Sequence, residues 1–340
     1  MQRVGVPLLV LAGLATIAAS PGHAAVIGEP DRRTFTEWAE ENGLPIAEVE
    51  ARYAASGEVV CYWVDDLDRD RSSFSSAQVT ARADLITMSG HVFIDLASCE
   101  DKAPARSCTF STERNGETLT AALDEIVDLG PPCAGNFPPP LRERLLQDWA
   151  VIRLAHPIDV VPYAVDGADA MVAPGLKVTS VIRSQDYLVP LDDGTTEHPE
   201  TIGECTVRDT VVQFGRTTYF ATDCDGAQRS SGGSVLDTDD EGPPRLLGIW
   251  AASTEERYQL DEAVARIIEA GAYRDDLVNM AEYDPANWSS RHVPVAGGFL
   301  RAILRAVAET DRARFEASGD GDDAVPEVRP GPGPAILDDI

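Results

Sequence analysis

Hydrophobic residues follow two different patterns along the chain. At residues 31–57, 258–280 and 297–315 they recur every three or four positions, which predicts helices, the first interrupted by a Gly-Leu-Pro turn at 43–45. From about residue 58 to 250, short runs rich in β-branched and aromatic residues alternate instead with clusters of turn residues. This second pattern favours antiparallel barrels or sandwiches over alternating strand–helix units.

The β-rich region contains short runs separated by loops of different character. A Pro-rich stretch at 130–140 predicts a long loop, and residues 155–170 mix Pro, Gly and Asp as a connection between two units does. The runs with strand character are residues 59–64, 77–81, 84–93, 107–112, 150–154, 176–182, 205–214, 218–223, 233–237 and 246–252.

These patterns divide the chain into five parts. They are a leader at 1–24, an N-terminal helical segment at 25–57, a β-rich unit at 58–158, a second β-rich unit with C-terminal helices at 159–315, and a tail at 316–340. The helical segment is either a propeptide that is removed or a part that packs on the fold. The tail is acidic and rich in Pro and Gly, so we expect it to be disordered and dispensable for folding.

The leader has the order of a secretory signal peptide. Arg3 precedes an apolar run at residues 6–19, and small residues follow. The run is too short to span a membrane as a helix. We expect cleavage after Ala24 or Ala25 and a secreted or periplasmic protein.

Charge and cysteine content narrow the possible partners. The chain has 57 acidic and 28 basic residues and a formal net charge of −29, so we expect neither nucleic acid nor a membrane as partner. Six cysteines in an exported chain predict disulfides. Cys205–Cys224 is the pairing we expect first, and Cys99–Cys108 is the second choice. Neither a Cys-x-x-Cys nor a His-Glu-x-x-His motif occurs, so we expect no metal and no cofactor.

Three short motifs carry residues that can act together chemically. His91 ends a strand-like run in TMSGHVF, Asp148 opens the run DWAVIRL, and Ser231 stands in SSGGSVL. Each alone has a simpler interpretation, respectively a structural histidine, a surface carboxylate at a helix end, and a flexible Ser-Gly loop. A serine hydroxyl is a weak nucleophile, however, and becomes reactive beside an imidazole base that a carboxylate orients.

The order of these motifs resembles the chymotrypsin-like (trypsin-like) serine proteases. CDGAQRSSGGSVLD at 224–237, followed by LLGIWAAS, is most similar to the bacterial secreted branch that includes the glutamyl endopeptidases. The resemblance covers roughly residues 58–255. It implies an all-β fold of two Greek-key antiparallel barrels, with an N-terminal helical segment and C-terminal helices.

The resemblance also implies an exported serine endopeptidase, a hydrolase whose substrates are polypeptides. His91 would take the Ser231 proton and later give it to the leaving amine, while Asp148 would hold the imidazole in place. The backbone N–H groups of Arg229 and Ser231 would form the oxyanion hole.

Three residues depart from the family pattern at this turn: Arg229, Ser230, which stands where trypsin itself has Asp, and Ser234, which replaces the usual Pro. Arg229 stands where the family nearly always has Gly, and such turns often need a positive φ that is unfavourable for a residue with a side chain. We expect the peptide to flip in the free protein, so that one oxyanion donor is absent until substrate binds.

Two further residues concern substrate preference. Asp225 is interpreted as part of an acidic surface loop, with the wall of a pocket for a basic side chain as the alternative. Trp250 stands in Gly-Ile-Trp where the resembling glutamyl endopeptidases have His, which argues against acidic substrates.

Two other functions remain open. The departure at Arg229 is compatible with a protease-fold protein of weak or no activity that acts as a binding module. If all three motifs match the family by accident, the third interpretation is an acidic, disulfide-bonded β-sandwich adhesin.

Overall fold

The computed structural model describes residues 31–318 with several gaps. The gaps are at residues 66, 131–132, 134–143, 166–171, 186, 191–194, 214–215, 227–228, 239–241 and 256–287. The expected signal peptide, the expected helix at 258–280, most of the Pro-rich loop and almost all of the expected tail lie outside the described residues.

Six antiparallel strands close the first barrel in the order β2-β3-β4-β7-β6-β5. They are β2 (Ser56–Val64), β3 (Asp70–Val79), β4 (Leu85–Met88), β5 (Cys108–Arg114), β6 (Glu117–Leu129) and β7 (Ala150–Leu154). Two short turns, η1 (Gly90–Val92) and η2 (Ala105–Ser107), lie between β4 and β5. Branched and aromatic side chains such as Val59, Phe110 and Ile152 are fully buried in this barrel, as the strand-like runs predict.

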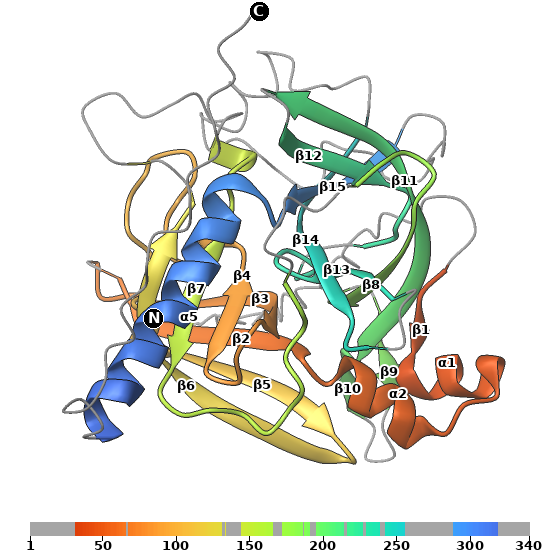
Figure 1. The fold of residues 1–340 in the computed structure, drawn as a ribbon, viewed down its shortest axis with the longest axis horizontal. Helices are drawn as coiled ribbons and strands as arrows, with labels where there is room; N and C mark the ends of the chain where they lie inside the picture. Colours follow the sequence, from red (N-terminus) through yellow and green to blue (C-terminus); the bar gives the residue numbers. More distant parts are fainter. Residues whose placement is uncertain are drawn as a thin grey trace, which may run out of the picture.

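Six strands also close the second barrel. They are β8 (Lys177–Arg183), β11 (Glu200–Gln213), β12 (Arg216–Thr222), β13 (Ser234–Asp237), β14 (Arg245–Glu255) and β15 (Trp288–Pro294). The order is β11-β12-β15-β14-β13-β8, and a pairing of β11 with β8 completes the ring. Figure 1 shows the two barrels side by side, the first coloured mainly orange to yellow and the second mainly green to blue-green.

The N-terminal segment packs beside the second barrel (Figure 1). Its first strand, β1 (Arg33–Thr34), adds to the edge of β11. A separate small sheet is formed by β9 (Val189–Pro190) and β10 (Thr196–Glu197), which pair with each other. α1 (Phe35–Asn42) begins with a capping box, in which the Thr34 and Glu37 side chains satisfy each other's backbone N–H groups. α2 (Ile46–Tyr53) follows and leads into β2.

A long C-terminal helix returns to the first barrel. α5 (Gly297–Ser318) lies along β6 and β7 (Figure 1), and Phe299 stacks on Trp149 with ring centroids 5.0 Å apart. Arg305 of the helix forms an ion pair with Asp128 of β6. No helix in the described part of the chain is long and apolar enough to cross a membrane.

The predicted fold class is confirmed. The chain forms two closed antiparallel barrels, with helices in the N-terminal segment and at the C-terminal end. The hydrophobic pattern does not predict β6 and β15, however. β6 buries little more than Ala121 and Leu123 between acidic residues, and β15 buries the polar side chains of Ser290 and His292.

Three disulfides pair the six cysteines. Cys205–Cys224 is present as predicted. The second choice, Cys99–Cys108, is wrong, because the bonds are Cys61–Cys108 and Cys99–Cys133. Cys61 and Cys108 lie directly opposite each other on β2 and β5, so the strand register decides the pairing.

Candidate active site

Two hydrogen bonds join His91 to Asp148. Asp148 Oδ2 lies 2.6 Å from His91 Nδ1, and Asp148 Oδ1 accepts a hydrogen bond of 2.8 Å from the His91 backbone N–H. The Asp148 side chain is 1 % exposed, whereas the His91 side chain is 30 % exposed. Because the carboxylate accepts from Nδ1, the neutral imidazole keeps Nε2 as a proton acceptor.

The register of two neighbouring strands explains this contact. Met88 at the end of β4 pairs with Ala150 at the start of β7. His91 lies in η1, directly after β4, and Asp148 lies just before β7. The two side chains therefore meet at the same end of one strand pair.

Ser231 lies in the turn that leads into β13. Its carbonyl oxygen accepts a hydrogen bond of 2.7 Å from Ser75 Oγ of β3. The next residue, Gly232, has a φ of 81°, and a Cβ there would lie 2.3 Å from the Ser76 carbonyl oxygen. Only glycine allows this close approach of the turn to β3.

The same turn packs against the segment that carries His91. A Cβ on Gly232 would lie 2.8 Å from the backbone nitrogen of Ser89, two residues before His91. Both Gly232 N–H and Ser89 Oγ donate to the Trp250 carbonyl oxygen, at 2.8 and 3.3 Å. Among the described residues, the hydrogen bonds of His91 go to Asp148 and Lys102, and none goes to Ser231.

Comparisons with known proteins give a likeness in structure but not in sequence. No family model and no curated protein matches the chain. A solved Glu endopeptidase in complex with MPD superposes with a TM-score of 0.52 at 14 % identity, covering 83 % of this chain and 99 % of that chain. The chain has the fold of the chymotrypsin-like serine proteases. A scabies mite inactivated protease paralogue has a TM-score of 0.46 at 10 % identity, covering 76 % of this chain and 96 % of that chain.

Within this chymotrypsin-like fold, Arg229 occupies the turn before Ser231 in a left-handed conformation. Its φ is 76°, so the expectation that the peptide flips to avoid a positive φ is wrong. The Arg229 carbonyl oxygen accepts hydrogen bonds from Ser76 N–H at 3.0 Å and Ser76 Oγ at 2.9 Å. These contacts with β3 offset the backbone strain. The sequence indicated the strain but not the contacts.

Asp225 is buried, which contradicts its interpretation as part of a surface loop. The residue is 1 % exposed, and its Oδ2 accepts a hydrogen bond of 3.2 Å from the Asp31 backbone N–H. Burial, together with the neighbouring Asp225 carboxylate, raises the pKa of Asp31 to about 8. The N-terminal segment thus contacts this loop at Asp31. Among the described residues, no group of His, Cys, Asp and Glu is arranged to hold a metal ion.

Trp250 is also buried, at 2 % exposure. Its ring fills the space beside Gly226, where a Cβ would lie 2.6 Å from a ring carbon. His292 contacts the ring edge-on with centroids 5.0 Å apart, and its Nε2 forms a hydrogen bond of 2.8 Å with Thr222 Oγ1. Burial lowers the pKa of His292 to about 3, so this imidazole is neutral.

Sequence reasoning missed two residues near the site. Lys102 Nζ donates a hydrogen bond of 2.8 Å to the His91 carbonyl oxygen, and burial lowers the pKa of this lysine. Glu58 of β2 forms an ion pair with Arg229. The scarcity of lysine was the one available signal for Lys102, since Lys177 is the only other lysine in the chain. Nothing in the sequence pattern pointed to Glu58.

Proposed function

We propose that this protein is an exported serine endopeptidase with His91, Asp148 and Ser231 as its catalytic triad. The observation that carries the proposal is the pair of hydrogen bonds between His91 and the buried Asp148, in a chymotrypsin-like fold beside the Ser231 turn. A buried carboxylate with both oxygens bound to one histidine is suited to orienting a general base.

The reaction proceeds in two steps. Ser231 Oγ attacks the substrate carbonyl carbon while His91 Nε2 takes the hydroxyl proton, and the imidazolium then gives this proton to the departing amine. Water next attacks the acyl-enzyme, His91 takes a proton from that water, and the same proton returns to Ser231 as the acid product leaves. Asp148 stabilises the imidazolium in both steps and keeps its negative charge.

The developing oxyanion is stabilised by backbone N–H groups of Arg229 and Ser231. The positive φ of Arg229 supports this role, because a flipped peptide would require a different φ. One donor of this type typically contributes a factor of about 10²–10³ to turnover. The same observation weakens the alternative of an inactive binding module, which rested on Arg229.

Polypeptides are the substrate class, and small uncharged side chains before the scissile bond fit the site best. Asp225 already accepts a hydrogen bond from the N-terminal segment, and the Trp250 ring fills the space beside Gly226. Neither side chain is therefore exposed to receive a large or charged substrate group.

Export is supported by the cysteine chemistry. All six cysteines are paired, and such bonds persist in oxidising compartments. The expected signal peptide itself lies outside the described residues.

A pool of unstructured peptides, analysed by mass spectrometry after incubation, tests the proposal. Peptide cleavage is expected with the natural chain and absent with Ser231→Ala, with most cuts following small uncharged residues. Equal cleavage by both proteins would refute the role of Ser231. No cleavage by a folded natural chain would favour the binding module, and cuts mainly after Arg or Glu would refute the proposed preference alone.

A further inference from the structure

Arg229 has a side chain at a position where glycine is the usual solution. The residue holds a φ of 76°, which is unfavourable for any residue with a Cβ. Some contact outside the turn must therefore stabilise the conformation. We call residues 229–231 the oxyanion turn.

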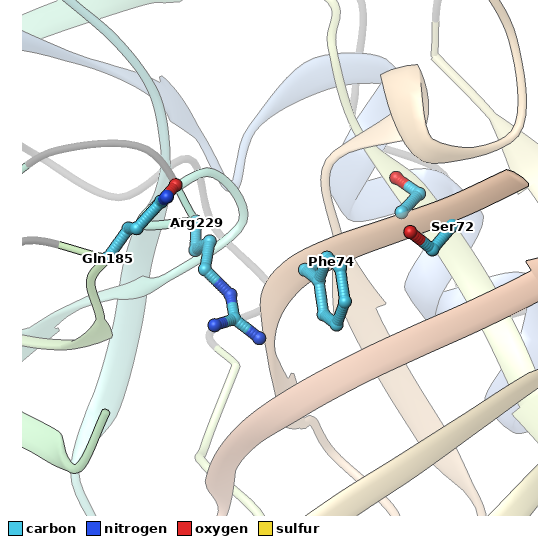
Figure 2. Close-up of a pocket in the computed structure, with 5 residues that line it drawn as sticks. Ser72, Phe74, Gln185 and Arg229 are labelled. Carbon is cyan, nitrogen blue, oxygen red and sulfur yellow. The ribbon is translucent and has the colours of Figure 1, made fainter. Parts of the chain in front are cut away.

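The guanidinium of Arg229 makes two contacts with the first barrel. Nη2 lies 2.7 Å from Glu58 Oε1, and the guanidinium carbon lies 4.2 Å from the centre of the Phe74 ring. Figure 2 shows the Arg229 side chain extending from its turn toward Phe74, with Gln185 on the other side. A cation over an aromatic face and an ion pair each favour this one position of the side chain.

The Glu58 carboxylate is well placed to hold the arginine. Its side chain is only 8 % exposed, and that of Arg229 is 18 % exposed, so solvent screens the pair less than at the surface. The contact is close but is not aligned as a hydrogen bond, which makes it mainly a charge interaction. Arg183 Nη1 lies 3.7 Å from the other Glu58 oxygen and serves as a second, weaker partner.

The partners of Arg229 itself all belong to the barrel that carries His91 and Asp148. Glu58 lies on β2, and both Phe74 and Ser76 lie on β3, where Ser76 holds the Arg229 carbonyl oxygen. The oxyanion turn belongs to the second barrel. Its conformation is thus fixed by side-chain and main-chain contacts with the opposite barrel.

We infer that Glu58 is a positioning residue which, with Phe74, clamps Arg229 and holds the oxyanion turn in its left-handed conformation before substrate binds. The inference rests on the proposed function. The clamp replaces the conformational freedom of glycine with an ion pair and a ring contact.

A double-mutant cycle separates this role from general stability. Glu58→Gln is made in the natural chain and in Arg229→Gly, and kcat and KM are measured with a neutral peptide that the natural chain cleaves. We expect kcat to fall roughly 10- to 100-fold with little change in KM in the natural chain, which does not exceed the factor of about 10²–10³ that one oxyanion donor contributes. In the Arg229→Gly background the same change should alter kcat less than about threefold, because glycine adopts a positive φ without a clamp.

Matched controls follow from the structure. Glu113→Gln removes a half-exposed carboxylate that contacts Arg183 at 3.8 Å but does not contact Arg229, and its kcat should stay that of the natural chain. Phe74→Leu removes the ring and keeps the ion pair, so it should reproduce the loss of kcat if Glu58→Gln does not fold. Melting temperatures of all variants show any general loss of stability.

Two outcomes would overturn the clamp. One is an unchanged kcat for both Glu58→Gln and Phe74→Leu. The other is an equal fall of kcat in both backgrounds, which would indicate a general structural role. If the natural chain cleaves no peptide, the proposed function fails, and the crystal structure of Glu58→Gln then decides about the clamp. A negative φ at residue 229 supports it, and a retained positive φ refutes it.

Discussion

At the scale of single residues, the candidate site depends on how one carboxylate is shared. Both oxygens of Asp148 are bound to His91, one to the ring and one to the backbone. The ring bond sets the tautomer, and the backbone bond ties the carboxylate to η1. Lys102 fixes the other side of the same residue through the His91 carbonyl oxygen. His91 is thus held at three points, while Nε2 stays available for Ser231.

The three candidate catalytic residues should behave as a unit. Ser231→Ala and His91→Ala are each expected to remove nearly all hydrolysis, and the double variant should be scarcely worse than either. Asp148→Asn should lower turnover by about four orders of magnitude without unfolding the protein, because the amide favours the wrong tautomer. Steady-state kinetics with one peptide substrate measures all four variants. Independent effects that multiply would contradict the triad.

Arg229→Ala and Arg229→Gly should differ clearly in turnover, although alanine and glycine differ by only one methyl group. Arg229→Ala removes the clamp and keeps the cost of a Cβ at positive φ, about 1–2 kcal/mol. Arg229→Gly removes both, so its turnover should exceed that of the alanine variant by roughly 5- to 30-fold if this strain depletes the active conformation. Comparing kcat of the two variants checks the strain argument. An alanine variant as active as the glycine variant would show that the left-handed conformation is not limiting.

At the scale of elements, strand ends position the site and a disulfide braces it. The β4–β7 register brings His91 to Asp148, and Cys205–Cys224 ties β11 to the loop before the oxyanion turn. The sequence motifs identified the strand ends at His91, Asp148 and Ser231, because turn residues mark these positions. β6 and β15 were missed because each fully buries only one branched apolar side chain, Leu123 and Val293 respectively, and their other buried positions carry alanine, serine and histidine.

Loss of the Cys205–Cys224 bond should destabilise the second barrel and loosen the loop before Ser231. A variant with both Cys205→Ser and Cys224→Ser is expected to lose about 2–5 kcal/mol in the free energy of unfolding, as is typical for exported domains. Urea unfolding measures the loss, and hydrogen exchange around residues 224–231 measures the loosening. Unchanged exchange in that loop would contradict its bracing role.

At the scale of the whole molecule, two barrels face each other and the N-terminal segment closes one side of the second. The resemblance of three ordered motifs was sufficient to predict the fold class. It was not sufficient for contacts between distant segments. Asp225 accepts a hydrogen bond from Asp31, and Arg229 pairs with Glu58, so neither contact follows from local sequence. The disulfide pairing of Cys61 likewise required the strand register.

Two buried groups should make the stability depend on pH with opposite signs. Burial raises the pKa of Glu200 from 4.5 to about 8, although Arg183 opposes the shift. Folding therefore retains a proton there, and this contribution is lost as the pH rises from about 4.5 to 8. Burial lowers the pKa of His292 from 6.5 to about 3, so its contribution is lost as the pH falls below about 6.5.

Glu200→Gln tests the contribution that is lost as the pH rises. Urea unfolding between about pH 5 and pH 8 should show a smaller loss of stability in the variant than in the natural chain, because glutamine has no proton to release. Glu117→Gln, which changes an exposed carboxylate at the start of β6 that does not act on Glu200, should keep the natural slope. An identical slope for all three proteins would show that Glu200 is already ionised at neutral pH.

The central claim is that Ser231 is a nucleophile activated by His91 and Asp148. Reaction with a fluorophosphonate tests it most directly, because the reagent bonds to an activated serine and needs no knowledge of the natural substrate. Intact mass and peptide mapping should show one adduct per chain, on Ser231, with the rate strongly reduced in His91→Ala and no adduct in Ser231→Ala. No adduct on the folded natural chain, or an adduct on another serine that forms equally fast in His91→Ala, would contradict the claim.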